Sequence, residues 1–195
     1  MVDWDAFPMI RRTYRRAFGA TLEPGFAQYM RYGDVPEHGA ALGFTRAGSE
    51  RLFLERYLDA PIEALTSVAL ARPVARDKIV EIGNFAAVDA MALIELWGRT
   101  ANDLADTSEV AAATLTKPLR DMFGRLGVPI HVLALATADR LGEEASHWGR
   151  YYELDPQVCV GEIVAGQRAI SALLRRRRGS NRTRREAERL DPEAA

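Results

Sequence analysis

Apolar residues recur at helical spacing near the start of the chain and at strand-like spacing further on. A helix is predicted over residues 4–18, where every third or fourth residue is apolar, and Gly19 ends it. Its apolar face consists of Phe7, Ile10, Tyr14 and Phe18. A second, short helix is predicted over residues 25–32. Residues 38–45 are small and apolar and predict a strand, with 51–58 as its hairpin partner across a turn.

The middle of the chain alternates helix and strand patterns. Pro61 opens a helix predicted over residues 62–70, because proline suits the first helical position. The most strand-like stretch is 78–87. Strict alternation predicts two sides for it, one with Ile79, Glu81, Gly83 and Phe85 and the other with Val80, Ile82 and Asn84. A strongly amphipathic helix is predicted over 90–104, and Asp89 is placed to cap it.

The last third of the chain adds shorter elements and then loses its apolar periodicity. The predicted strands are 109–115, 130–135, 148–153 and 158–163, and the predicted helices are 117–126 and 164–177. From Gly179 onward the chain is charged, so we expect one domain over residues 1–178 and a basic, disordered tail over 179–195. Strand–helix–strand units imply parallel pairing, and the hairpin implies an antiparallel part. The expected fold class is therefore α/β (α+β mixed), with helices on both faces of a mixed twisted sheet.

Composition narrows the function classes. The chain has 195 residues, of which 48% are hydrophobic, and a formal net charge of −1, which disfavours nucleic acid or membrane as partners by bulk electrostatics. A single cysteine, Cys159, allows no intrachain disulfide and is expected to be a buried small hydrophobe. No signal-peptide pattern and no apolar run of about 18 residues appears. We therefore expect a soluble, cytoplasmic protein.

Four groups of residues resemble the thermostable hemolysin family, which has the acyltransferase fold of the GNAT (GCN5-related N-acetyltransferase) kind. They occur in the family's order at 52–63, 80–86, 120–127 and 148–153. The strand Glu81-Ile82-Gly83-Asn84-Phe85-Ala86 is also similar, more distantly, to a strand of acyl-homoserine-lactone synthases that reads Glu, apolar, small, Arg, Phe, Ala. Asn84 stands where those synthases have arginine, so the arginine's salt-bridge role is lost or reassigned.

The resemblance implies an N-acyltransferase that moves an acyl group from a thioester to an amine. Glu81 then becomes the candidate general base, because burial in an apolar strand raises the pKa of a carboxyl group. The structural alternative is a carboxylate paired with an arginine such as Arg76. Asn84 is a candidate to orient the acceptor or to donate to the thioester carbonyl, and the alternative is a residue that only caps a bulge.

The fold implies that the central strand parts from its neighbour and grips the phosphopantetheine arm of the donor. Phe85, Ala86, Ala87 and Val88 are the candidate cradle, and Thr114, Thr116 and Arg120 are candidates to line the same cleft or simply to cap a helix. The Gln/Arg-x-x-Gly-x-Gly/Ala pattern that grips a coenzyme A (CoA) pyrophosphate is missing. Its absence argues against a CoA pyrophosphate grip and makes an acyl-carrier-protein thioester, which has only one phosphate to hold, a credible donor beside acyl-CoA. Either donor would be a substrate, and no tightly bound cofactor is expected.

Other residue types add weaker candidates. Tyr151 and Tyr152 alternate on a predicted late strand, and Tyr152 is the candidate proton donor to the leaving thiol, unless it is a core or rim tyrosine. His38, His131 and His147 match no metal-ligand spacing, so no metal is predicted.

The strongly basic end of the chain has eight arginines after residue 174. We interpret them as a solvated tail, with docking of an acidic carrier protein as the sharper alternative. An apolar late strand also leaves a homodimer open.

Three functions compete at this point. The leading hypothesis is an N-acyltransferase of specialised metabolism that acts on a small amine acceptor. The second is a membrane-active hemolysin, which the family name suggests but which no signal segment or basic, strongly hydrophobic amphipathic helix supports. The third is a noncatalytic module that binds an acyl group or its carrier.

Overall fold

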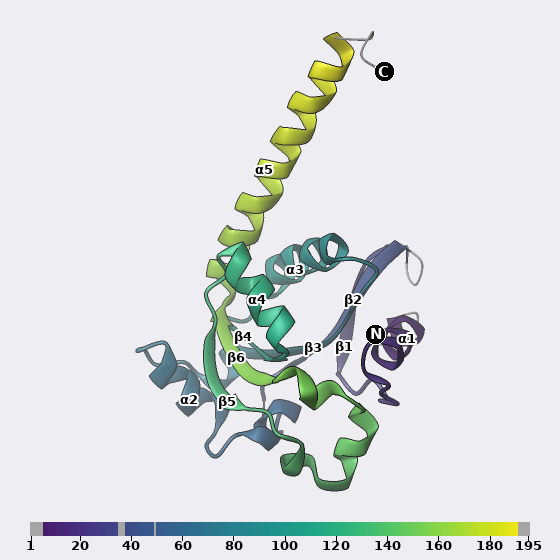
Figure 1. The fold of residues 1–195 in the computed structure, drawn as a ribbon. Coiled ribbons are helices and arrows are strands. Elements are labelled where there is room, and N and C mark those ends of the chain that lie inside the picture. Colours follow the sequence, from purple (N-terminus) through teal and green to yellow (C-terminus); the bar gives the residue numbers. More distant parts are fainter. Residues whose placement is uncertain (1–5, 35–37, 49, 191–195) are drawn as a thin grey trace.

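A six-stranded mixed sheet organises the computed structural model, which describes residues 6–34, 38–48 and 50–190 (Figure 1). The strands, in sheet order, are β1 (Gln28–Asp34), β2 (His38–Arg46), β3 (Ile79–Ala87), β4 (Val110–Leu115), β6 (Gln157–Glu162) and β5 (His131–Leu135). The helices are α1 (Ala6–Phe18), α2 (Ile62–Ala69), α3 (Ala90–Leu104), α4 (Lys117–Leu126) and α5 (Ile163–Leu190). Four 3-10 segments complete the described chain: η1 (Phe53–Tyr57), η2 (Arg76–Lys78), η3 (Ala138–Trp148) and η4 (Tyr151–Leu154).

The strand–helix–strand unit β3-α3-β4 makes the parallel pair of the sheet, as the alternating pattern predicts. Every other neighbouring pair is antiparallel, because β1 and β2 form a hairpin and β6 returns between β4 and β5. Helices α3, α4 and the start of α5 cover one face, and α1 and α2 lie on the other (Figure 1). The mixed sheet with helices on both faces is confirmed.

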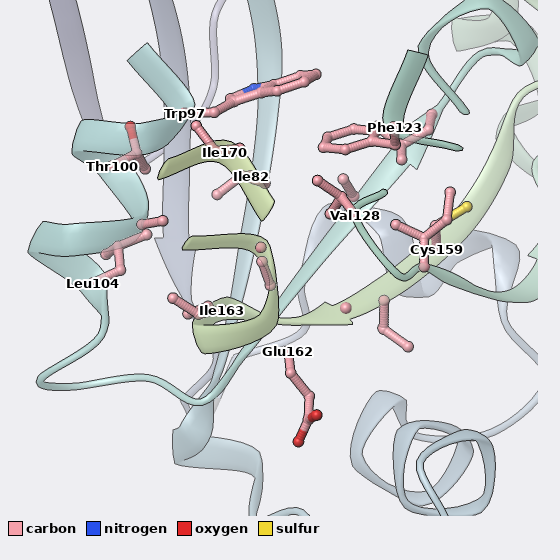
Figure 2. A pocket seen from close by; sticks show the side chains of 18 residues that line it. Ile82, Trp97, Thr100, Leu104, Phe123, Val128, Cys159, Glu162, Ile163 and Ile170 are labelled. Atoms are coloured by element: carbon pink, nitrogen blue, oxygen red, sulfur yellow. The ribbon is translucent and has the colours of Figure 1, made fainter. Parts of the chain in front are cut away.

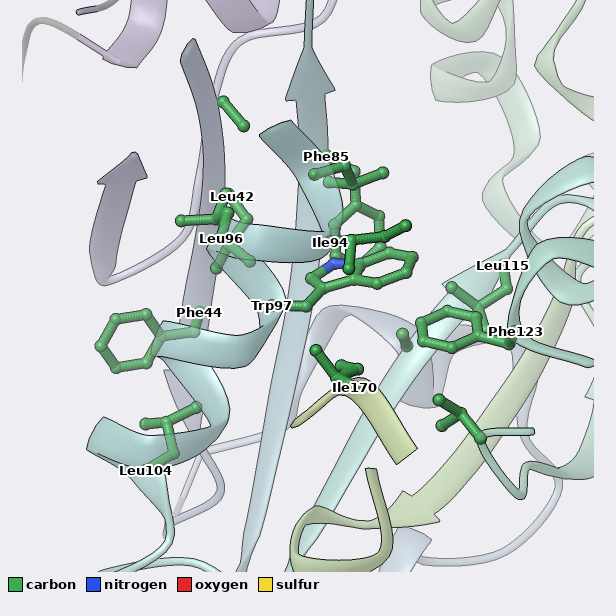
Figure 3. Packing of buried hydrophobic residues seen from close by; sticks show 14 of the residues in the cluster. Leu42, Phe44, Phe85, Ile94, Leu96, Trp97, Leu104, Leu115, Phe123 and Ile170 are labelled. Atoms are coloured by element: carbon green, nitrogen blue, oxygen red, sulfur yellow. The ribbon is translucent and has the colours of Figure 1, made fainter. Parts of the chain in front are cut away.

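The larger hydrophobic core lies under α3 (Figure 3). Trp97 of α3 stacks on Phe123 of α4 with ring centroids 4.1 Å apart and an interplanar angle of 13°, and Phe85 of β3 meets the Trp97 ring edge-on at 5.8 Å. Asp89 caps α3, as predicted, by accepting a hydrogen bond from the Ala92 N–H at 2.8 Å. This packing fixes one side of β3 and leaves its other side to the opposite face.

The opposite face holds two smaller clusters. One joins α1 to β1, β2 and β3 through Met9, Ile10, Tyr14, Tyr29, Ala41 and Ala86. The other joins η1 and α2 to β3, β4 and β6 through Leu54, Tyr57, Ile62, Ile79, Val110 and Val158. The two clusters lie on either side of the part of β3 that carries Glu81 and Asn84. Residues 4 and 5, where the first helix is predicted to begin, lie outside the described residues.

The prediction of a short helix over residues 25–32 is wrong, because this segment belongs largely to β1. All seven residues of β1 pair with β2, and the Tyr29 side chain is buried against the ring of Phe7 at 4.8 Å. Two helical turns are too short to be stable alone, so strand pairing outweighs the local pattern. The hairpin partner of the strand at 38–45 is thus the segment before it and not 51–58.

Two other predicted strands are also wrong. The 51–58 segment forms η1, because the Glu55 carboxylate accepts hydrogen bonds from the backbone N–H groups of Leu52 at 2.7 Å and Ile62 at 3.2 Å and so closes a tight turn. The 148–153 segment lies at the junction of η3 and η4, where Gly149 takes a positive φ of 54° that no strand accommodates. Apolar alternation there reflects packing of loops onto the sheet.

The last helix extends further than the sequence pattern predicts. It continues from Ile163 through Leu190, past the expected end at Arg177, and its second half projects away from the sheet (Figure 1). Arginine, glutamate and alanine have high helix propensity, so loss of apolar periodicity does not by itself end a helix. The division into a 1–178 domain and a tail stays a prediction.

Candidate active site

Strands β3 and β4 diverge next to Glu81. Their parallel pairing covers only Ile79–Glu81 on β3 and Val110–Ala112 on β4, although β3 continues to Ala87 and β4 to Leu115. Beyond Glu81 the edge of β3 that faces β4 has no strand partner. The separation leaves backbone groups and side chains of both strands facing a gap in the middle of the sheet.

A β-bulge follows immediately on β3. Gly83 pairs with Gly43 and Ala86 pairs with Ala41, so Leu42 of β2 faces two residues of β3, Asn84 and Phe85. Asn84 adopts a positive φ of 52°, a conformation that asparagine tolerates better than most residues. The bulge brings Asn84 to the same side as Glu81 and directs Phe85 into the core beneath Trp97. The strict alternation predicted for 78–87 is therefore wrong beyond Gly83.

Glu81 is buried with no ion-pair partner among the residues that the structure describes. Its side chain is 3% exposed, and its carboxylate accepts hydrogen bonds from the N–H groups of Leu54, at 3.1 Å, and Phe53. Burial raises the pKa of Glu81 to about 8, and the two N–H groups oppose this rise. The alternative in which Arg76 neutralises Glu81 is wrong.

Arg76 instead belongs to a neighbouring ionic cluster. Its guanidinium contacts the carboxylates of Glu55 at 2.7 Å and Glu63 at 2.9 Å. This pairing, mainly the hydrogen bonds from Arg76, lowers the pKa of Glu55 to about 2. Two buried carboxyl groups in one region thus have opposite pKa shifts.

Two adjoining cavities lie beside Glu81. The outer one has a volume of about 640 Å³ and is lined in part by Glu50, Arg51, Arg56 and Thr45. The inner one is a slot of about 40 Å³ between β3 and β4. Five residues line both cavities and form the neck between them: Phe26, Phe53, Glu81, Asn84 and Trp148. A carboxyl group and a carboxamide therefore lie at a neck otherwise made of aromatic rings.

Three tyrosines line the inner slot: Tyr14, Tyr57 and Tyr151. Burial raises the pKa of each well above the usual range, so all three are neutral hydrogen-bond donors at ordinary pH. Tyr152, the sequence-based candidate, lies behind Tyr57, with 2.8 Å between the two hydroxyl oxygens, and lines neither cavity. Tyr57 is a site residue that the sequence does not predict, because the pattern of residues 51–58 is that of a strand.

Comparison with known proteins identifies the family of this chain. Residues 5–167 match the family model described as thermostable hemolysin. The chain belongs to the thermostable hemolysin family. A search of curated proteins finds no match.

Solved structures share the fold of this thermostable hemolysin family member at low sequence identity. TofI in an apo form is 14% identical, with a TM-score of 0.55, over 88% of this chain and 91% of that chain. FeeM, an N-acyl amino acid synthase from uncultured soil microbes, is 15% identical, with a TM-score of 0.53, over 85% and 92%. LasI, an AHL synthase, is 9% identical, with a TM-score of 0.54, over 82% and 81%. The predicted fold is confirmed.

The structure brings some predicted site residues together and leaves others apart. Those that line the inner slot are Glu81, Asn84, Phe85 and Thr114. Those that line neither the slot nor the outer cavity are Ala86, Ala87, Val88, Thr116, Arg120 and Tyr152. Ala86 is buried under α1, and Val88 is 48% exposed with its N–H donating to the Gly39 carbonyl. The gap between β3 and β4 therefore begins after Glu81, and of the four residues predicted as the cradle only Phe85 lines the slot.

Of the predicted site residues, Thr114 lines the slot and Arg120 does not. The Thr114 hydroxyl oxygen is buried without a partner among the described residues and lies in the slot, while the Thr114 carbonyl accepts a hydrogen bond from Tyr151 at 3.2 Å. Arg120 donates to the carbonyl oxygens of Leu115, at 2.7 Å, and Asp155, at 2.6 Å, and so fixes α4 to the loop before β6. Thr114 is available to a ligand, whereas Arg120 is already bound.

An apolar pocket of about 90 Å³ lies on the α3 face of the same gap (Figure 2). Ile82 lines both this pocket and the inner slot, so the pocket and the slot adjoin across β3. Trp97, Phe123 and Ile170 form part of its wall, with Cys159 on the β6 side (Figure 2). Burial raises the pKa of the Cys159 thiol to about 11, so it lines the pocket as a neutral group.

Within the described residues, no three His, Cys, Asp or Glu side chains are grouped so that they could hold a metal ion. No helix in that part of the chain has the length and apolar character needed to cross a bilayer.

Proposed function

We propose that this chain is an N-acyltransferase that moves an acyl group from a thioester of CoA or of an acyl carrier protein to a small amine. The observation that carries the proposal is the position of Glu81, a buried carboxyl group with no ion-pair partner in the described chain, where β3 and β4 diverge and two cavities meet. FeeM and LasI, which share the fold, are named as synthases of N-acyl amino acids and AHLs, which supports acyl transfer as the chemistry.

The acceptor amine enters through the outer cavity in this proposal. Its nitrogen reaches the neck, where the ionised Glu81 accepts the proton that the amine loses as the C–N bond forms. Asn84 lies beside Glu81 and donates a hydrogen bond to the Tyr29 hydroxyl at 3.4 Å, so its carboxamide is oriented by the protein and able to position the acceptor. A base with a pKa near 8 is well matched to this step.

The donor thioester lies in the inner slot, along the edge of β3 that β4 leaves unpaired. Its pantetheine arm takes the place of a neighbouring strand and bonds to backbone groups past Glu81. The acyl chain continues past Ile82 into the apolar pocket, where removal of hydrocarbon from water stabilises the complex. Thr114, whose hydroxyl group lacks a partner among the described residues, is in reach of the thioester end of the acyl group.

The leaving thiolate must gain a proton when the C–S bond breaks. Tyr57 lines the slot with a neutral hydroxyl group and contacts the Tyr152 hydroxyl, which is only half-buried. Tyr57 supplies the proton to sulfur and regains one from Tyr152, which exchanges with solvent. In this arrangement Tyr152 keeps the donor role inferred from the sequence, but acts through Tyr57.

The decisive experiment offers the purified full-length protein octanoyl-CoA and an octanoyl-carrier-protein thioester, each with a mixture of small primary amines and amino acids. Mass spectrometry of the products should show an N-octanoyl amide, formed with one donor faster than with the other. Glu81→Gln should lower its formation by about 10²–10⁴-fold. Amide formation at the wild-type rate by Glu81→Gln would show that another group is the base, and no amide from either donor with the wild type would favour the noncatalytic alternative.

A further inference from the structure

The Phe26 side chain packs directly against two glycines. Gly43 of β2 and Gly83 of β3 lie directly opposite each other in the sheet. A Cβ atom at Gly43 would lie 2.7 Å from Cβ and Cγ of Phe26, and one at Gly83 would lie 2.6 Å from Cζ at the far end of the ring. The ring therefore spans both strands, and any side chain at either glycine would displace it.

This packing places the Phe26 ring at the neck between the two cavities. Phe26 lines the outer cavity and the inner slot, as do Phe53 and Trp148, whose ring centroids are 5.8 Å apart. Glu81 and Asn84 complete the neck. A molecule in the outer cavity that contacts Glu81 therefore lies next to these three rings.

The backbone next to Phe26 is fixed, whereas its ring is held only by packing. The Phe26 N–H donates to the Tyr29 hydroxyl at 3.0 Å, and the neighbouring Ala27 N–H donates to Thr45 at 3.1 Å. The same Tyr29 hydroxyl accepts a hydrogen bond from Asn84, so the ring position is tied to the bulge beside Glu81. A fixed backbone with a ring in van der Waals contact gives the neck a defined width.

The neck also suits a cation. Aromatic faces attract ammonium groups, and the rings of Phe26 and Trp148 line the neck. The Phe53 ring already has the Arg56 guanidinium 5.5 Å from its centroid. Glu81 at the inner end adds a negative charge once it ionises. These surroundings favour an amine that arrives as its ammonium ion and gives its proton to Glu81.

We propose that Phe26 is a specificity-determining residue that sets the width of the acceptor path to Glu81, so that the protein accepts primary amines on an unbranched carbon and rejects amines on a fully branched one. The inference rests on the proposed function, because it assigns the neck to the acceptor. It predicts that the selection is made at the neck, before any acyl group is transferred.

The test measures binding alone, with n-butylamine and tert-butylamine as probes of equal composition and different width. Ligand-observed NMR titrations at a pH above the pKa of Glu81 would give the affinities of wild type, Phe26→Ala, Phe26→Leu and Gly43→Ala. Met30→Ala is the matched control, because it removes a partly buried apolar side chain from β1 that packs on the α3 face. Thermal unfolding of each variant checks that the fold is intact.

Phe26→Ala should raise the affinity for tert-butylamine by at least about tenfold relative to n-butylamine, with a smaller gain for Phe26→Leu. Gly43→Ala, which keeps the ring but pushes it off β2 toward the neck, should not raise the relative affinity for tert-butylamine, and Met30→Ala should leave it unchanged. Binding of the branched amine only to Phe26→Ala would also support the proposal. Equal affinity of wild type and Phe26→Ala for the branched amine, including no binding to either, would overturn it. Failure of the proposed function would differ, because the probes would bind but no amide would form from either thioester.

Discussion

Glu81 has a raised pKa because of where it lies, and the same burial has a cost in stability. A buried carboxyl group whose pKa is higher in the folded state than in the unfolded state makes the folded protein bind more protons. Stability then falls as pH rises from the ordinary value of 4.5 toward about 8, because the charged form is disfavoured in the folded state. The ionised form of the candidate base therefore lowers the stability of the folded protein.

Substitution of Glu81 by glutamine should remove this dependence. The glutamine carbonyl can still accept a hydrogen bond from the Leu54 N–H, so the local structure should persist. We expect the free energy of unfolding of the wild type to lose about 1.4 kcal/mol for each pH unit inside the window from 4.5 to about 8, relative to Glu81→Gln. Urea denaturation of both proteins across that range measures the difference. Parallel curves for the two proteins would contradict the raised pKa.

The Tyr57 and Tyr152 hydroxyl groups should act as one unit. Tyr57→Phe removes the hydroxyl group in the slot, so it should lower the rate of thioester consumption by roughly 100-fold. Tyr152→Phe should lower it less, and the double variant should be no worse than Tyr57→Phe alone, because the second hydroxyl acts only through the first. Steady-state kinetics with Glu81 intact measure all three variants. Additive losses would show that the two hydroxyl groups act independently.

At the scale of elements, the turn η1 holds the site together. It presents the N–H groups of Phe53 and Leu54 to Glu81, and it contributes Phe53 and Tyr57 to the slot. The turn itself is closed by Glu55, which is bound to Arg76 and to two backbone N–H groups. The Glu55 carboxylate therefore stabilises η1, and η1 in turn positions the Glu81 carboxylate.

Glu55→Gln should loosen that element. The low pKa of Glu55 means that its stabilisation is present above the ordinary value of 4.5 and is lost as pH falls toward about 2. We expect the variant to lose roughly 2–3 kcal/mol of unfolding free energy at neutral pH, since Arg76 is left partly buried with one partner fewer. Asp59→Asn, which removes an exposed partner of Arg140, is the control and should change stability little. Equal stability of the two variants would contradict the structural role of Glu55.

The sequence predicts the elements that depend on their own pattern and fails where the tertiary structure decides. Strand β3, helix α3 and its Asp89 cap follow from periodicity, and Glu81 stands out as a charge inside an apolar strand. Strand β1 and turn η1 do not, because one needs its partner strand and the other needs the Glu55–Arg76 pair. Phe26 reaches the neck from the loop before β1, and Phe53 and Trp148 reach it from η1 and η3, so no spacing in the sequence brings them together.

At the scale of the whole molecule, α5 divides into a packed half and a projecting half. Ile163 and Ile170 are buried in the core under α3, and Leu173 and Leu174 pack against it. Arg175, Arg176 and Arg177 are exposed, and the chain beyond them contributes five more arginines by sequence. The first half of α5 therefore contributes to the core, and the second half is rich in positive charge by sequence.

A chain truncated after residue 178 separates these two roles. Its free energy of unfolding should stay within about 0.5 kcal/mol of the full chain, because Ile163, Ile170, Leu173 and Leu174, which pack in or on the core, remain. If the donor is an acidic carrier protein, truncation should raise the KM for the carrier-protein thioester while the KM for octanoyl-CoA stays the same, and added salt should reduce the difference because salt screens charge attraction. Steady-state kinetics with both donors at two ionic strengths measure this. An equal rise in both KM values would place the contribution of the second half of α5 in the fold, and no change in either would leave it a solvated extension.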